Sequence, residues 1–341
     1  MFKKFSISLV ILALFFSLTL FGYASVVKAE GYKIGFSNYS VTNSWRVQME
    51  AEFKAKAEEL KDKGVISEYY MTNANGEISK QISDVNDLIT KGVDALLITA
   101  ASPKALAPVC EKAEQQGIKV ISFDNIVSSD KLTSKVGINE VEFGRIGAKW
   151  LADKLDGKGN IIVLNGVAGT SVNADRWEGA KEIFDKFPQI NILGKANAAW
   201  DYAQGKTATE NFLSAYSDID GVWSQGGAMT EGAIDAFNAA GRELVPMTGE
   251  GNNGMLKAWK KYSDEGFTSI APASPTYQSS RALEVAINAL NGEEVKAQYE
   301  LEIPIILDNT LQDYVRPELP DSFWCVTNLS NEQIQKYLYN N

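Results

Sequence analysis

Residues 33–46 have the sequence KIGFSNYSVTNSWR, which changes from a short apolar run to the start of an amphipathic stretch. The run 33–36 predicts a buried strand, and the pattern over 45–63 predicts a helix. In an open α/β sheet, ligands bind outside the carboxyl ends of the strands, so the loop between these two elements is a candidate binding loop. Trp45 and Arg46 give it an aromatic ring and a guanidinium. A neutral polyol fits such a pair, because its C–H face stacks on rings and its hydroxyls bind charged groups.

The same alternation of short apolar runs and amphipathic stretches continues along the chain. The expected strands are 33–36, 66–71, 95–99, 120–123, 161–164, 190–196, 221–223, 244–248 and 268–271. The expected helices are 45–63, 77–91, 103–116, 141–155, 174–186, 202–216, 229–240, 255–261 and 277–290. Continuously apolar strands separated by helices are typical of parallel sheets buried on both faces. The sequence therefore predicts an α/β fold with two doubly wound parallel-sheet lobes.

Residues 1–29 predict an export signal. Two lysines precede a nearly unbroken apolar run over 5–21, and small residues at Val27 and Ala29 fit cleavage before Glu30. The alternative is an uncleaved membrane anchor, since the run approaches the length of a membrane span. Polar, turn-prone sequence follows, which favours cleavage. We therefore expect the mature chain in the periplasm or at the cell exterior.

Charge and composition exclude several function classes. The net charge is -10, and removal of the signal makes the chain more negative, which argues against nucleic acid as a partner. The chain contains no histidine, so it lacks the commonest general base and metal ligand. Cys110 and Cys325 lie in apolar or aromatic surroundings, which favours buried free thiols; a disulfide between them stays open.

Several short motifs occur in a fixed order along residues 32–307. They are KIGF with NSWR (33–36 and 43–46), GVDALLI (92–98), GIKVISFDN (117–125), LNGVAGTS (164–171) and DRWEG (175–179). In this order and spacing, the set resembles the periplasmic sugar-binding proteins of ABC transporters. The similarity is greatest to the ribose-binding-protein group of type I solute-binding proteins.

The resemblance implies how the two lobes are connected. Three crossings between the lobes are expected near 136–139, 271–274 and 304–308. The N-terminal lobe would comprise 32–136 plus 275–303, and the C-terminal lobe 139–272 plus a tail, 308–341. The tail breaks the strand–helix alternation, so we expect it across the outside of the lobes or over the hinge. A three-strand hinge allows rigid closure on a ligand.

The resemblance also implies which residues contact the ligand. They are Asn43, Trp45, Arg46, Asp124 and Asn125 from one lobe, and Arg176, Trp200, Gln225 and Glu250 from the other. Structural alternatives exist for four of them. Arg46 could be an ordinary surface arginine at a helix start, and Asp124 could simply turn the chain. Arg176 could form an ion pair with Asp175 or Glu178 on its own helix, and Trp200 could be a core residue.

This chain departs from the group's pattern at several positions. Asn125 replaces a frequent arginine, Gly226 and Gly227 replace an Asn-Asp pair, and Glu250 follows Gly249 where many relatives have an aromatic-Asp pair. Thr99 and Pro272 replace an asparagine and a glutamine. These changes predict a more open pocket in the C-terminal lobe and a sugar that is bulkier than ribose or differently substituted.

The resemblance implies a binding protein that captures a monosaccharide-like carbohydrate by hinge closure and delivers it to a membrane permease. We expect a monomer without cofactor or metal. An enzyme is disfavoured, since the chain has no Gly-x-Ser-x-Gly motif and no histidine. A receptor for the furanosyl signal autoinducer-2 is the alternative, although the loop 38–44 lacks the lysine of those receptors. Arg176→Ala or Asp124→Ala is expected to weaken binding and leave thermal stability nearly intact.

Overall fold

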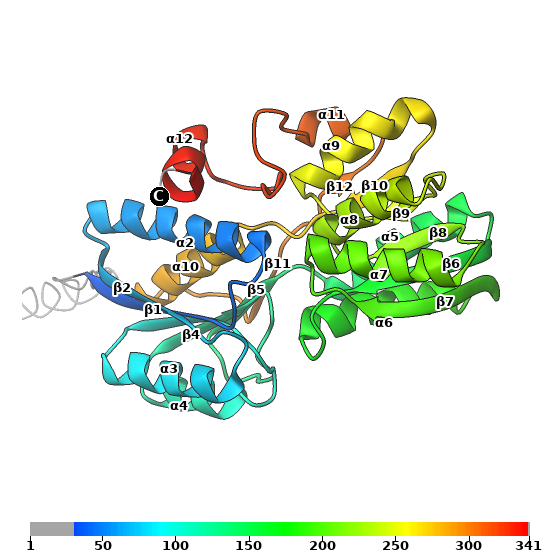
Figure 1. The fold of residues 1–341 in the computed structure, drawn as a ribbon. Helices are drawn as coiled ribbons and strands as arrows, with labels where there is room; N and C mark the ends of the chain where they lie inside the picture. The colour runs from blue at the N-terminus through cyan, green and yellow to red at the C-terminus, as the bar shows by residue number, and fades with distance from the viewer. Residues whose placement is uncertain (1–30, 340–341) are drawn as a thin grey trace, which may run out of the picture.

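The structure is a computed structural model in which residues 31–339 are described. It consists of two lobes, each a twisted six-stranded sheet with helices on both faces, as Figure 1 shows. The predicted α/β class with two doubly wound lobes is confirmed. The predicted export signal, 1–29, lies outside the described residues.

The sheet of the N-terminal lobe has the strand order β11-β5-β4-β3-β1-β2, and its strands all pair in parallel. The strands are β1 (Tyr32–Asn38), β2 (Ile66–Asn73), β3 (Ala95–Thr99), β4 (Lys119–Phe123), β5 (Ser134–Gly137) and β11 (Gln298–Glu300). One face is covered by α2 (Ser44–Asp62) and α10 (Gln278–Leu290), the other by α3 (Ile78–Thr90) and α4 (Ala107–Gln115).

The sheet of the C-terminal lobe has the order β12-β10-β9-β8-β6-β7, with β12 antiparallel to β10. The strands are β6 (Lys158–Asn165), β7 (Gln189–Asn197), β8 (Gly221–Ser224), β9 (Met247–Thr248), β10 (Ser269–Pro272) and β12 (Ile305–Ile306). One face is covered by α5 (Glu140–Lys154) and α6 (Ser171–Phe184), and the other by α7 (Tyr202–Ala215), α8 (Gly227–Ala239) and α9 (Asn253–Tyr262).

Burial explains why the central strands were recognisable. All residues of β3 are buried, and so are the apolar residues 161–164 of β6. Strands sandwiched between two helical layers have no solvent face, so their sequences are continuously apolar. The short edge and crossing strands β5, β11 and β12 lack this pattern and were missed. The expected strand over 244–248 is reduced to β9, because Pro246 offers no backbone N–H to a ladder.

Three helices that start near the opposite lobe are fixed by capping side chains. Asn43 caps α2, Thr170 caps α6 and Asp201 caps α7, each accepting a hydrogen bond from a backbone N–H in the first turn. The cap at Thr170 explains why α6 begins at Ser171, earlier than the predicted start at residue 174.

The chain passes between the lobes after β5, after β10, and again between β11 and β12. The tail then forms α11 (Leu311–Tyr314), α12 (Asn331–Ile334) and a π-helical turn, η2 (Gln335–Tyr339). Figure 1 shows α11 beside α9, whereas α12 lies over α2. The sequence grouped 308–341 with the C-terminal lobe as a tail across the outside of the lobes or over the hinge. In the structure, apolar residues of the tail's end pack against α2 of the N-terminal lobe.

Among residues 31–339, no helix is both long and apolar enough to cross a lipid bilayer.

Candidate functional site

A pocket with an empty volume of about 350 Å³ lies between the lobes. Its lining residues are Asn43, Trp45, Arg46, Asp124, Asn125, Val172, Arg176, Trp200, Glu250, Ser274 and Trp324. The structure therefore brings together all the predicted site residues except Gln225. Val172, Ser274 and Trp324 also line the pocket and were not among the candidates.

An ion pair forms the N-terminal-lobe side of the pocket. Arg46 is 2% exposed, and its Nη2 lies 2.5 Å from Oδ2 of Asp124. The same oxygen accepts hydrogen bonds from Thr99 Oγ1 and Asn125 Nδ2, both at 2.9 Å. None of these bonds uses Oδ1 of Asp124, which leaves an acceptor for a ligand hydroxyl. Asp124 has φ +56°. This left-handed backbone conformation is uncommon for residues other than glycine and recurs at functional sites.

Aromatic rings and a cap hold Arg46 in place. Its guanidinium lies 4.0 Å from the centre of the Tyr39 ring. The Asn43 side chain accepts a hydrogen bond from the Arg46 backbone N–H at 3.0 Å. Burial lowers the pKa of Arg46, but Asp124 and Tyr39 together raise it above its ordinary value. Arg46 therefore stays charged although it lies at a helix N-terminus, where the dipole disfavours a cation.

The C-terminal-lobe side is built around Arg176. Its Nε lies 2.6 Å from Oε2 of Glu140, and its Nη1 lies 3.3 Å from Oε2 of Glu250 and 2.7 Å from the Gln225 carbonyl oxygen. The guanidinium also stacks on Phe143, 3.6 Å from the ring centre. The carboxylate partners in the described chain are thus Glu140 and Glu250, and the alternative pairing within α6 is wrong.

Two buried carboxyl groups share this one arginine. Burial raises the pKa of Glu140 to about 7, and the opposing effect of Arg176 does not cancel it. Burial also raises the pKa of Glu250. No sequence pattern identified Glu140, since it lies in the first turn of α5, where an acidic residue is expected for the helix dipole alone.

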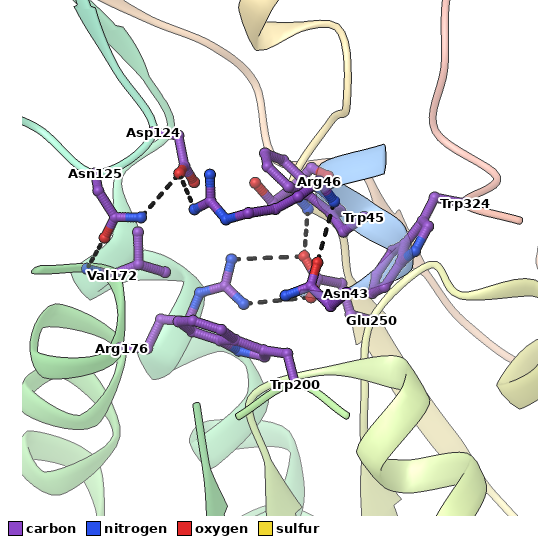
Figure 2. Close-up of a pocket in the computed structure, with 11 residues that line it drawn as sticks. Asn43, Trp45, Arg46, Asp124, Asn125, Val172, Arg176, Trp200, Glu250 and Trp324 are labelled. Atoms are coloured by element: carbon purple, nitrogen blue, oxygen red, sulfur yellow. Dashed lines mark hydrogen bonds and ion pairs between the residues drawn. The ribbon is translucent and has the colours of Figure 1, made fainter. Parts of the chain in front are cut away.

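Trp200 forms the floor of the pocket in Figure 2. A Cβ on Gly166 would lie 2.1 Å from its ring, and a Cβ on Gly226 would lie 2.6 Å away. The indole therefore occupies the room that Gly226 leaves. The expectation of a pocket more open than in ribose binders stays a prediction.

Gln225 does not line the pocket, but its side chain holds together segments that do. Its amide nitrogen donates to Asn165 Oδ1 at 3.0 Å and to the Asn173 carbonyl at 3.1 Å, and its Oε1 accepts from the Gly166 backbone at 3.3 Å. The side chain ties the loop after β6 to α6. Its backbone carbonyl, by contrast, binds Arg176.

The residue Ser274 joins the two walls to a hinge segment. Its carbonyl oxygen accepts a hydrogen bond from Trp45 Nε1 at 3.0 Å, and its backbone nitrogen donates to Glu250 Oε1 at 3.0 Å. Across the gap, Asn125 Oδ1 lies 3.5 Å from the backbone nitrogen of Val172 at the start of α6. The two pocket walls are therefore connected through Ser274 of the hinge and also by the direct contact between Asn125 and Val172.

Comparison with known proteins places the chain in a family. Residues 34–294 match the periplasmic binding protein domain. A ribose import binding protein of Bacillus subtilis (strain 168) is 30% identical over 81% of this chain and 87% of its own length. A xylitol-binding protein of Mycolicibacterium smegmatis is 32% identical over 70% of this chain and 68% of its own length.

A solved structure supports the same family assignment. An ABC transporter solute-binding protein from Thermobispora bispora superposes with a TM-score of 0.80 and 28% identity, covering 89% of this chain and 94% of that one. These relatives are binding proteins and not enzymes. The chain belongs to the periplasmic binding protein family.

Proposed function

We propose that this protein captures an uncharged sugar or sugar alcohol of monosaccharide size between its lobes and passes it to an ABC permease. The observation that carries the proposal is the pocket itself, in which each lobe contributes a tryptophan ring and a buried, paired arginine. Aromatic faces suit the C–H surface of a carbohydrate, and charged groups make strong hydrogen bonds with its hydroxyls.

The charge distribution favours a neutral ligand. The two arginines that line the pocket are already paired, Arg46 with Asp124 and Arg176 with Glu140 and Glu250. A phosphate or carboxylate on the ligand would face these carboxylates without a free cation. Hydroxyl groups avoid this conflict, because they can donate to the carboxylate oxygens and accept from the remaining N–H groups.

Unpaired polar atoms around the pocket support the same ligand class. Arg46 Nε, Glu140 Oε1 and Trp200 Nε1 are buried without a hydrogen-bond partner among the described residues. Such groups are rare in folded proteins, and an unmade bond costs about 1–3 kcal/mol. A ligand rich in hydroxyls at the pocket would supply partners to those that face it.

The connections support hinge closure as the mechanism of capture. Trp45 and Glu250, one from each lobe, both bind the backbone of Ser274 in the crossing after β10. A sugar that contacts both walls binds the closed form better than the open form, and this difference in affinity is what shifts the equilibrium. The names of the relatives, which include ribose and xylitol binders, are consistent with such ligands.

We also propose where the protein acts and in what oligomeric state. We place the mature chain outside the cytoplasmic membrane, because the apolar run 5–21 fits an export signal. It would act there as a monomer that carries its ligand to the permease.

A ligand screen tests the proposed function. Purified protein is mixed with monosaccharides, sugar alcohols, uronic acids, sugar phosphates and autoinducer-2, and the melting temperature is measured; hits are quantified by calorimetry. A neutral sugar should raise the melting temperature by mass action, and Asp124→Asn should abolish the shift. The bound sugar should be recovered unchanged. The proposal is wrong if only charged ligands or autoinducer-2 bind, or if no neutral sugar does.

A further inference from the structure

The C-terminal tail crosses from one lobe to the other and reaches the pocket on the way. In Figure 1 it runs from α11, beside α9 of the C-terminal lobe, to α12, over α2 of the N-terminal lobe. It crosses around residues 321–325, in addition to the three crossings described above. These residues lie beyond the match to the family domain, which ends at residue 294.

The first half of the tail is fixed to the C-terminal lobe. Leu311 and Val315 belong to its apolar core. The side-chain amide of Asn253, at the start of α9, donates to the carbonyl oxygens of Arg316 and Leu319 at 2.8 and 3.0 Å. These contacts anchor the tail just before the crossing.

The second half is fixed to the N-terminal lobe. Glu52 of α2 is 2% exposed, and its Oε1 accepts hydrogen bonds from the Asn328 backbone nitrogen at 3.0 Å and from Thr327 Oγ1 at 2.5 Å. Leu329 and Ile334 are buried against the alanines of α2. The same Glu52 oxygen also accepts a hydrogen bond from Thr276 Oγ1 at 3.0 Å, outside the tail. The two bonds from the tail to this buried carboxylate indicate a permanent attachment, because they would be lost if the tail detached.

Trp324 lies at the crossing itself. Its backbone nitrogen and oxygen pair with the Gln48 side-chain amide at 2.9 and 2.8 Å, and its Nε1 donates to Ser44 Oγ at 2.9 Å. The next residue, Cys325, donates its backbone N–H to the Gly251 carbonyl of the other lobe at 2.8 Å. Figure 2 shows the Trp324 indole on the side of the pocket away from Asp124.

We propose that the tail is a fourth connection between the lobes and that it supplies Trp324 as a wall of the ligand pocket. The inference rests on the proposed sugar-binding function for the role of Trp324. Because the tail is attached to both lobes on either side of a short crossing, it limits how far they can separate. The indole lies in the apolar core of the N-terminal lobe and is held by polar contacts at its backbone and its Nε1. Because it also lines the pocket, it contacts a ligand there and sets the size of ligand that the pocket accepts.

A first experiment tests the connection without any sugar. Gln48→Ala removes both bonds to the Trp324 backbone, although Gln48 does not line the pocket. Small-angle X-ray scattering of the unliganded protein should show a larger radius of gyration for this variant than for the parent. Gln333→Ala, which changes only the cap of α12, is the control and should leave the radius unchanged. An unchanged radius in Gln48→Ala overturns the connection.

A second experiment tests the wall with a neutral sugar that the parent binds. Trp324→Phe should weaken its affinity by about tenfold or more and should improve relative binding of a larger homologue. Trp150→Phe is a matched control, because Trp150 is a partly buried tryptophan of α5 outside the pocket. If parent and Trp324→Phe bind the sugar with equal affinity, Trp324 is not a wall of the ligand pocket. A parent that binds no sugar overturns the proposed function instead, and the scattering result still decides the connection.

Discussion

The indole of Trp200 packs directly on the backbone of Gly166, so that a Cβ at Gly166 would lie 2.1 Å from ring atom Cζ2. We therefore expect Gly166→Ala to displace the ring from the pocket floor. Sugar affinity should fall at least tenfold, and overpacking should cost about 1–3 kcal/mol of the free energy of unfolding. Calorimetric titration and urea unfolding measure the two effects.

The control for this variant is Gly147→Ala in the same lobe, where the nearest atom would lie at 3.4 Å, an ordinary contact. It should bind sugar like the parent. If Gly166→Ala also binds like the parent, Trp200 does not form the floor that we describe.

Replacement of Arg176 should affect stability as well as binding. The sequence alone suggested that Arg176→Ala would leave thermal stability nearly intact. The structure places Arg176 between two buried carboxyl groups, Glu140 and Glu250, which lose their common partner in the variant. Breaking a buried pair in this way costs about 3–5 kcal/mol. Urea unfolding at pH 7 should show a loss of this size.

Arg145→Ala provides the comparison, because Arg145 pairs with Glu142 and Glu182 at the surface. Exposed ion pairs contribute little to stability, so this variant should unfold close to the parent. Similar losses in both variants would contradict the buried cluster.

Glu140 should make stability depend on pH near neutrality. Burial raises its pKa from an ordinary value of 4.5 to about 7 in the folded protein. The folded state therefore binds the proton more tightly than the unfolded state, and this contribution to stability is complete below pH 4.5 and is lost as the pH rises to about 7. Glu140→Gln cannot titrate, so the free energy of unfolding of this variant relative to the parent should rise between pH 5 and pH 8.

Urea unfolding of both proteins across this pH range makes the measurement. Glu142→Gln, an exposed neighbour on α5, controls for the loss of a surface charge. A difference between Glu140→Gln and the parent that stays constant with pH would show that Glu140 does not titrate in this range.

Much of the fold was predictable because the central strands are buried on both faces and the residues that follow them lie at one edge of each sheet. Trp45 after β1 was found for this reason, and the resemblance to sugar-binding proteins implied Asp124 after β4. Contacts made across long sequence distances left no local pattern. Trp324 reaches α2 from 280 residues away through its bond to Ser44, and no periodicity indicates such a partner.

The pairing of the buried charged residues was equally hard to predict from the sequence. The sequence identified Arg176 as a candidate, but its partner Glu140 follows the first crossing between the lobes and is brought close only when α5 packs against α6. The tail shows the same limit, since its breaks in periodicity indicated an irregular segment but not the lobe on which it ends.

The two cysteines provide a last prediction, on chemical reactivity. Both are free thiols, and burial raises the pKa of Cys110 and of Cys325 to about 12. The thiolate is the nucleophile, so at pH 8 the folded protein should react with an aromatic disulfide reagent about a thousandfold or more slowly than an exposed cysteine. Both thiols should react at once in urea. Cys110→Ala should retain one slow thiol, which identifies Cys325. Prompt labelling of the folded parent would contradict the two slow free thiols. The absence of titratable thiols in urea before reduction would favour the disulfide that the sequence left open.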